Sequence, residues 1–233
     1  HHASLHVRAD RSQDGRTLAV VSETPGTGLL VDLATDSVRA PLLGHPQVGF
    51  VALSRDGRWM ASSGWHSDRV RLWNAATGTM VHEWTLSGVT AMVFFTPDSR
   101  ELIVSRRDEF GFHDVETLKP SRRIRRDVAQ HPGHVAFSPD GGLMALEMAP
   151  GIVHLKDAAT AKTVAKLEDP HGDRAGWMSF TPDGTQLVVT APYARAVHVW
   201  DLRAIRQRRK GMDLDWDWPE FAPADSVAQI AAP

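Results

Sequence analysis

The sequence predicts an all-β protein assembled from one repeated four-stranded unit. Three observations support this prediction: a short polar turn recurs, apolar segments enter and leave each copy, and no helical pattern of apolar residues separates the copies. The turn reads Ser/Thr-x-Asp-Gly/Ser and begins at residues 12, 54, 96, 138 and 181. The interval between copies is therefore 42 or 43 residues. A fixed period of this length is typical of a supersecondary unit that is repeated in space.

Each unit has the same internal order of strands. A first apolar strand enters the turn, as in "FVALS" and "HVAFS", and a second leaves it, as in "RWMASS" and "LMALE". A polar loop precedes a third strand, as in "RVRLWN" and "AVHVWD", and a second turn leads to a fourth strand, as in "TMVHEW", "SRRIRR" and "KTVAKL". Four antiparallel strands in each repeat are typical of the blade of a β-propeller. We expect five such blades, at about 5–43, 44–85, 86–127, 128–169 and 170–212.

The chemistry of the turn explains its recurrence without a catalytic role. In "SPDG", Pro139 sets the φ angle of the second turn residue, and Asp140 can accept a hydrogen bond from nearby backbone. Gly141 tolerates the positive φ that closes a tight connection. The repeated aspartates are therefore interpreted as structural.

Three segments resemble a known family. They are "LLGHPQVGFVALSRDGRWMASS" (42–63), "RLWNAATG" (71–78) and "HVWDLRA" (198–204), and they are similar to WD-repeat β-propellers. The resemblance extends over about residues 5–202 and is strongest in the second and fifth units. It implies a scaffold that binds other proteins.

The resemblance assigns structural roles to four residues. Trp73 and Trp200 take the family's third-strand tryptophan position, and we expect both to be largely buried. His45 takes the place of the family's structural histidine, and His171 lies near that place in the fifth unit. The other three units carry Val31, His113 and Lys156 at the tryptophan position, so the resemblance implies an incomplete structural hydrogen-bond network there.

The number of blades and the start of the chain leave alternatives open. WD-repeat propellers most often close with seven blades, so the resemblance implies that this chain is the C-terminal part of a larger propeller. A closed five-bladed ring is the alternative. The chain starts with His1 and His2 and not with Met, and these histidines are either native or a tag remnant.

The C-terminal segment departs from the repeat. Residues 202–211 predict one short basic helix that ends at Gly211, and residues 213–233 form an acidic, aromatic tail and linker. The tail either folds back over an apolar patch or serves as a docking segment. The ending "WDLRAIR…LDWDWP" resembles that of propellers in large bacterial multidomain proteins, many of which carry a serine/threonine protein kinase domain upstream. This resemblance implies a module of a bacterial regulatory or signalling protein.

Composition and motifs exclude several functions. The formal net charge of −2 argues against a nucleic-acid binder, and the absence of cysteine excludes disulfides and thiolate chemistry. No apolar run approaches the roughly 20 residues of a membrane span, and no signal stretch is present, so we expect a cytoplasmic protein. The segment 108–111, "DEFG", lacks the other kinase motifs. The segment 64–68, "GWHSD", has its three groups in one turn, where no catalytic triad can form.

Histidines are the only candidate metal ligands that the sequence suggests. His131 and His134 are three residues apart, and His171 opens the equivalent loop of the next unit. A zinc site needs three or four converging ligands, and twelve histidines make chance clustering common. We expect no metal and no cofactor.

The function predicted from the sequence is a non-catalytic scaffold for protein interaction. The loops between second and third strands, and those between blades, carry Arg and aromatic residues that dominate interface energetics. The candidate residues are Trp65, His66, Arg69, Arg106, Arg107, Arg174, Tyr193 and Arg195. Guanidinium groups suit an acidic or phosphorylated protein or peptide. The alternatives are a hydrolase-like enzyme on a propeller scaffold and a sensor of a small ligand.

Overall fold

The computed structural model describes residues 7–22, 27–42, 48–88, 90–127 and 129–221. The described chain is all-β except for one helix, as the sequence predicts. It divides into two compact units, His1–Gly133 and His134–Pro233.

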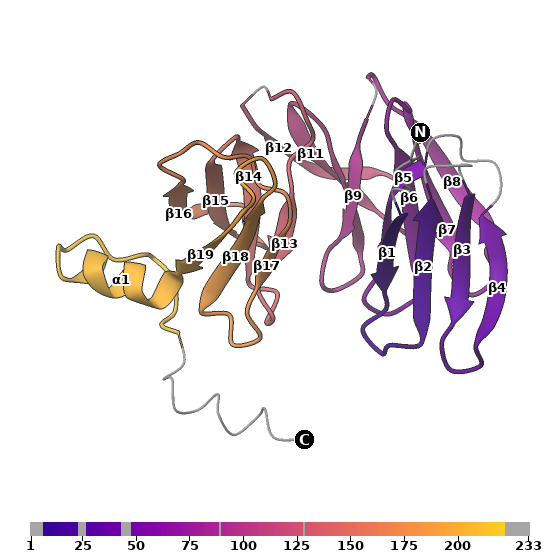
Figure 1. Cartoon of the computed structure of the whole chain (residues 1–233), viewed down its shortest axis with the longest axis horizontal. Helices are drawn as coiled ribbons and strands as arrows, with labels where there is room; N and C mark the ends of the chain where they lie inside the picture. The colour runs from indigo at the N-terminus through magenta and orange to yellow at the C-terminus, as the bar shows by residue number, and fades with distance from the viewer. Residues whose placement is uncertain (1–6, 23–26, 43–47, 89, 128, 222–233) are drawn as a thin grey trace. The chain divides into compact units, whose positions relative to one another are not determined.

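The first unit contains three antiparallel four-stranded sheets, each formed by consecutive strands (Figure 1). The sheet of blade one comprises β1 (Val7–Arg11), β2 (Thr17–Ser22), β3 (Thr27–Asp32) and β4 (Ser37–Leu42). That of blade two comprises β5 (Val48–Leu53), β6 (Trp59–Gly64), β7 (Arg69–Asn74) and β8 (Met80–Thr85). That of blade three comprises β9 (Met92–Phe95), β10 (Glu101–Ser105), β11 (Glu109–Asp114) and β12 (Pro120–Arg125).

The second unit contains the last two blades and the helix. Blade four comprises β13 (Val135–Phe137), β14 (Leu143–Ala149), β15 (Ile152–Asp157) and β16 (Thr163–Glu168). Blade five comprises β17 (Met178–Phe180), β18 (Gln186–Ala191) and β19 (Ala196–Asp201), followed directly by α1 (Leu202–Lys210). The five expected blades are present, and among the described residues the fifth sheet has three strands because the chain enters α1 where the others form a fourth strand.

A small polar network explains why the Ser/Thr-x-Asp turn recurs. The Ser138 hydroxyl donates to Asp140 Oδ1 at 2.5 Å and accepts from the Leu143 backbone N–H at 2.8 Å. The Gly142 N–H donates to the same Asp140 oxygen at 3.0 Å, and Gly141 has a φ of +75°. The same three hydrogen bonds occur at the turns that begin at Ser12, Ser54, Thr96 and Thr181. The hydroxyl and the carboxylate therefore satisfy backbone donors that a tight turn leaves unpaired.

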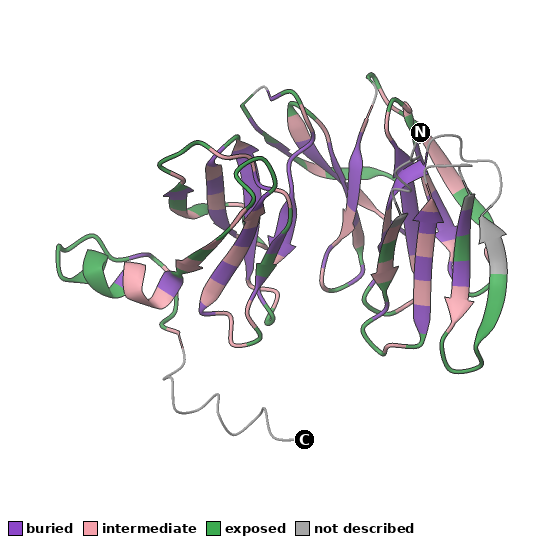
Figure 2. Ribbon diagram, viewed as in Figure 1, coloured by how far each residue is buried: buried purple, intermediate pink, exposed green. Residues whose placement is uncertain are grey.

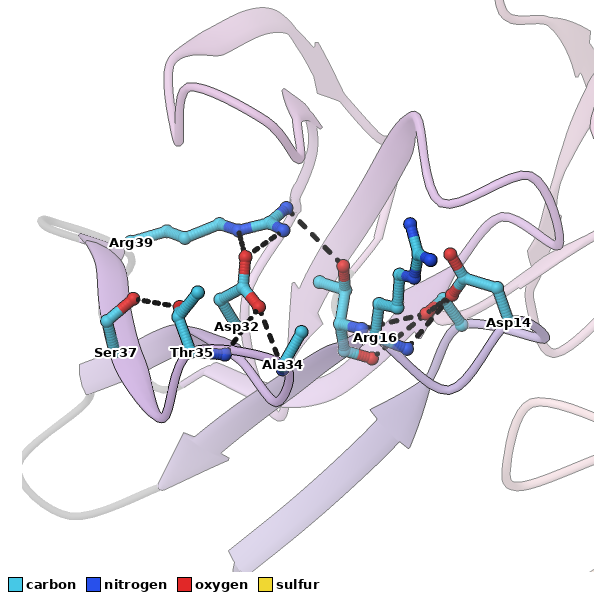
Figure 3. Close-up of polar contacts among 9 residues, drawn as sticks. Asp14, Arg16, Asp32, Ala34, Thr35, Ser37 and Arg39 are labelled. Carbon is cyan, nitrogen blue, oxygen red and sulfur yellow. Dashed lines mark hydrogen bonds and ion pairs between the residues drawn. The ribbon is translucent and has the colours of Figure 1, made fainter.

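In the first four blades, a second recurring set of contacts closes the turn after the third strand. In blade one, Asp32 accepts hydrogen bonds from the backbone N–H groups of Ala34 and Thr35 and pairs with Arg39 (Figure 3). The hydrogen bond from Arg39 is the main reason that the pKa of Asp32 is lowered. The fifth residue of this turn, counted from the Asp or Asn, has positive φ in each of the first four blades: Asp36, Gly78, Leu118 and Ala161.

The core consists of alternating strand residues that face neighbouring blades. Burial alternates along β2 and β18, which appear banded in Figure 2. In blade three, Phe110 and Phe112 are fully buried. Along β6 and β14, by contrast, consecutive residues are buried, so both faces of these inner strands are covered.

The four residues with structural roles implied by the family resemblance differ in environment. Trp73 is 4% exposed, and its indole Nε1–H donates to Ser62 Oγ at 2.9 Å. Trp200 is only half-buried, although it packs against the core of the second unit. The side chain of His171 is exposed, and His45 lies outside the described residues.

Helix α1 and the tail pack onto the second unit. Asp201 caps the helix N-terminus by accepting from the Ala204 N–H at 2.8 Å. Gly211 is the C-cap, as predicted, with a φ of −65°, and Asp213 has a φ of +57°. Trp216 is 5% exposed within the core of this unit. The described part of the tail therefore folds back over apolar surface.

Candidate partner-binding site

Four candidate residues of the first unit lie on two loops, whereas Arg69 is the first residue of β7. Trp65 and His66 follow β6, and Arg106 and Arg107 follow β10. The Trp65 ring packs on Phe50 at a centroid distance of 4.8 Å, so this tryptophan is half-buried. His66 is exposed with a φ of +56°, and its backbone N–H donates to Thr90 Oγ1 at 3.0 Å.

The arginines of the first unit already have partners. Arg69 Nη1 pairs with Glu83 at 2.5 Å, and Glu83 also accepts from Arg71 at 2.6 Å. The hydrogen bond from Arg71 is the largest of the effects that lower the pKa of Glu83. Arg106 pairs with Glu109, and Arg107 Nε donates to the Ala129 carbonyl at 3.0 Å. A bound acidic segment would compete with these contacts, so the positive potential here is weaker than the sequence suggests.

The candidate residues of the second unit surround one end of blade five. Tyr193 and Arg195 lie in the loop between β18 and β19, and Tyr193 is 71% exposed. Arg195 has a φ of +52° and is exposed. Arg174 is less available, because its guanidinium lies 4.0 Å from the buried carboxylate of Glu147 and its side chain is 17% exposed.

Trp177 belongs to this end of the blade, and sequence reasoning missed it as a site residue. It is 57% exposed, and its backbone N–H donates to Thr190 Oγ1 at 2.7 Å. The Thr190 N–H donates back to the Trp177 carbonyl at 2.9 Å, so this loop lies against the end of β18 that leads to Tyr193. The signal was present in "WMSF": Met178 and Phe180 are buried, and a period of two turns Trp177 outward.

We define the aromatic patch as Trp177, Tyr193 and Arg195. Two large, exposed aromatic side chains and one arginine on adjoining loops have the composition of an interface hot spot. The patch belongs to one compact unit and to loops held by backbone hydrogen bonds. It is therefore the better defined part of the candidate surface.

The segment "GWHSD" and the histidines considered as metal ligands make structural contacts with other described residues. Ser67 Oγ accepts from the Arg69 N–H at 3.2 Å, and His66 makes its hydrogen bond through its backbone. The His134 ring is 4% exposed and packs near Trp177 at a centroid distance of 5.7 Å. The His131 carbonyl accepts from Arg126 at 2.7 Å. No helix of the described chain is long and apolar enough to cross a membrane.

One segment of the chain matches a known repeat family. Residues 37–74 match the family described as "WD domain, G-beta repeat". This segment runs from β4 to β7, so it joins the last strand of one blade to three strands of the next. The chain therefore contains a WD40 repeat within an all-β propeller fold.

Two plant proteins are similar in sequence. One is pre-mRNA-processing factor 19 homolog 2 of Arabidopsis thaliana, 26% identical over 214 residues, which are 88% of this chain and 40% of that protein. The other is THO complex subunit 3 of the same organism, 26% identical over 148 residues, or 63% of this chain and 46% of that protein. The chain thus corresponds to less than half of the length of each relative.

Two solved structures share the fold. The β-propeller domain of Myceliophteria thermophila Cps50 (Swd1) superposes with a TM-score of 0.64 at 19% identity, over 78% of this chain and 61% of that one. Kuenenia stuttgartiensis hydrazine synthase superposes with a TM-score of 0.62 at 15% identity, over 88% of this chain and 80% of that one. These identities support the fold alone.

Proposed function

We propose that the chain is a non-catalytic scaffold that binds a protein or peptide through the aromatic patch. The observation that carries this proposal is the exposure of Trp177 and Tyr193, at 57% and 71%, on neighbouring loops of one blade. Exposed tryptophan and tyrosine supply large contact area at low cost in side-chain entropy, and rigid loops limit the backbone entropy lost on binding.

The proposed partner is an acidic or phosphorylated segment. Arg195 makes no ion pair or hydrogen bond through its side chain among the described residues, so its guanidinium is available for a carboxylate or phosphate. The first-unit loops at Arg69, Arg106 and Arg107 extend the proposed surface less strongly, because their charges are partly compensated. As a larger context, we propose a cytoplasmic regulatory or signalling protein of bacterial type.

The first experiment measures binding of fluorescent acidic, phosphorylated and neutral peptides to the full chain by fluorescence polarisation. Trp177→Ala and Tyr193→Ala are each expected to raise Kd about 30-fold, because central aromatic anchors contribute about 2 kcal/mol or more. Met80→Ala is the matched control, since Met80 is a comparably exposed apolar side chain on β8 of the other unit. Equal Kd values for all three variants would contradict the assignment of the patch.

A second measurement separates a scaffold from an enzyme. Incubation of the chain with chromogenic ester, phosphate and glycoside substrates should release no product above the uncatalysed rate. Product release that depends on the chain would favour the hydrolase-like alternative. Tight binding of a small metabolite and of no peptide would favour the sensor.

A further inference from the structure

A cluster of three metal-ligating side chains lies in the second unit, separate from the aromatic patch. Asp169 and Asp173 belong to the loop between β16 and β17, and His198 belongs to β19. One ligand atom from each of the three lies within 4.8 Å of the other two. The Nδ1 atom of His198 is 3.9 Å from Asp169 Oδ1. The side chains of His198 and Asp169 are 25% and 8% exposed.

The loop that carries the two aspartates is held in place by backbone contacts. The Asp169 N–H donates to the Gly151 carbonyl at 2.8 Å. The Asp169 carboxylate accepts from the backbone N–H groups of His171 at 3.1 Å and of Asp173 at 3.0 Å. A Cβ atom at Gly151 would lie 2.6 Å from the Gly172 Cα atom, so the two loops are in close contact. The convergence of the cluster is therefore built into the loop.

The cluster has ligand capacity that the protein does not use. The Nε2 atom of His198 is buried and has no hydrogen-bond partner among the described residues. The Asp173 carboxylate likewise makes no hydrogen bond or ion pair with a described residue. All three side chains line a cavity of about 20 Å³, enough for one water molecule or one ion. An orphaned buried nitrogen costs free energy unless a ligand or water satisfies it.

The local charge favours a cation. The buried carboxylate of Glu147 lines the same cavity, and Arg174 lies 4.0 Å from it. The carboxylates of Asp169, Asp173 and Glu147 and the guanidinium of Arg174 together carry a formal net charge of −2.

We propose that Asp169, Asp173 and His198 bind one divalent transition-metal ion of the zinc type, with water as the fourth ligand. Two carboxylate oxygens and one imidazole nitrogen are ligands that zinc accepts, whereas calcium takes six to eight oxygens. Metal–ligand bonds of about 2.0–2.2 Å in a tetrahedral site bring ligand atoms to about 3.5 Å from each other, so binding draws the cluster together by roughly 1 Å. The ion joins the loop after blade four to the last strand of blade five.

We expect the bound ion to stabilise the fold. His198 lies on β19, whose sheet has three strands in the described chain. A metal ion that crosslinks β19 to the preceding loop stabilises the native state and not the unfolded chain. Zinc at 100 times its Kd is expected to raise the melting temperature by about 5–10 °C.

The test titrates Zn²⁺ into the metal-free full chain by isothermal calorimetry, on a background in which His1 and His2 are replaced by Ala. One ion is expected to bind per chain. Asp173→Ala and His198→Ala should each raise Kd at least tenfold and remove the zinc-dependent shift in melting temperature. Asp173→Ala keeps the backbone N–H that Asp169 requires, so the loop is retained.

His171→Ala is the matched control, because this histidine is in the same loop, is exposed and is not part of the cluster. It should bind zinc as the parent does. Absence of stoichiometric binding by the parent would overturn the proposal, as would equal Kd values in parent and cluster variants. If one variant fails to fold, the absorption spectrum of the parent with Co²⁺ decides: intense tetrahedral bands support the site, and their absence contradicts it.

Discussion

Blades two and five both end their third strand in Trp followed by Asn or Asp, and the chain then continues into different structures. "RLWNAATG" in blade two continues through a tight turn into β8, whereas "HVWDLRAI" in blade five continues into α1. Both start in the same way: Asn74 accepts from the Ala76 and Thr77 N–H groups, and Asp201 accepts from the Ala204 N–H. A side-chain cap at this position therefore does not by itself decide between turn and helix.

The fifth residue of the turn distinguishes the two blades. Blade two has Gly78 there with a φ of +69°, whereas blade five has Ile205 within the helix. Positive φ is accessible to glycine and is a strained outlier for a β-branched side chain. The residues that follow Ile205 are good helix formers, and three basic side chains in the last turn favour the helix dipole. The chain in blade five therefore continues as a helix.

The two equivalent tryptophans differ in their environment. Trp73 is covered and hydrogen-bonded to Ser62, while Trp200 is half-buried. Strand pairing matches Met60 with Trp73 and Leu187 with Trp200, so Val189 stands where blade two has Ser62. Valine offers no acceptor for an indole N–H. The same motif residue thus contributes less in the fifth blade.

The largest expected effect is the difference in stability loss between substitutions of these two tryptophans. Trp73→Ala should cost about 3–5 kcal/mol, as for other buried aromatics. Trp200→Ala should cost only about 1–2 kcal/mol, because part of its side chain stays in water in the folded state. Urea unfolding monitored by circular dichroism gives both values. Equal losses would show that Trp200 is as well covered as Trp73.

The next effect concerns the helix and tail. Arg206 is 8% exposed, and it pairs with Asp215 at 2.8 Å and donates to the carbonyls of Trp218 and Pro219. Arg206→Ala should cost about 2–4 kcal/mol, since it leaves those acceptors without their donor. Limited proteolysis should then cut the tail near Trp216 faster than in the parent. Arg208→Ala, an exposed position of the same helix, is the control and should leave the cleavage rate unchanged.

Two substitutions to glycine should change the free energy of unfolding in opposite directions. Ala161 has a φ of +60° at the fifth turn residue of blade four, so Ala161→Gly relieves strain and should stabilise by up to about 1 kcal/mol. Ile205→Gly at the equivalent position places glycine in a helix and should destabilise by about 1 kcal/mol or more. Thermal unfolding of both variants tests the comparison. A stabilising Ile205→Gly would mean that the helix is not preferred there.

The smallest expected effect is a loss of stability at acidic pH. Hydrogen bonds from the Thr181 and Thr185 hydroxyls lower the pKa of Asp183 to about 2 from 3.8. Because the folded value lies below the unfolded one, this contribution is present above pH 3.8 and is lost as the pH falls towards 2. Thr185→Val should move the pKa of Asp183 back towards 3.8, as NMR titration would show. Blade two has Arg58 in place of Thr185 and so lacks this second hydroxyl.

Sequence reasoning predicted the repeat, the strand order and the helix, because these depend on local patterns. It interpreted Asp140 correctly as a turn residue but did not foresee that the Ser138 hydroxyl completes the network. It selected Arg69 and Arg106 as available charges, yet both pair with carboxylates of their own blades. The position of a long side chain depends on neighbours across the sheet, which a linear motif does not specify.

The sequence by itself determined the period of 42 or 43 residues, the five turns, and the order in which strands pair. Turn chemistry and alternating apolar residues are local, and each unit repeats them. Only the tertiary structure decided that Trp216 is buried and that Asp169 and His198 meet. These outcomes depend on contacts between segments that are distant in the chain, and burial and close approach arise only when those segments pack together.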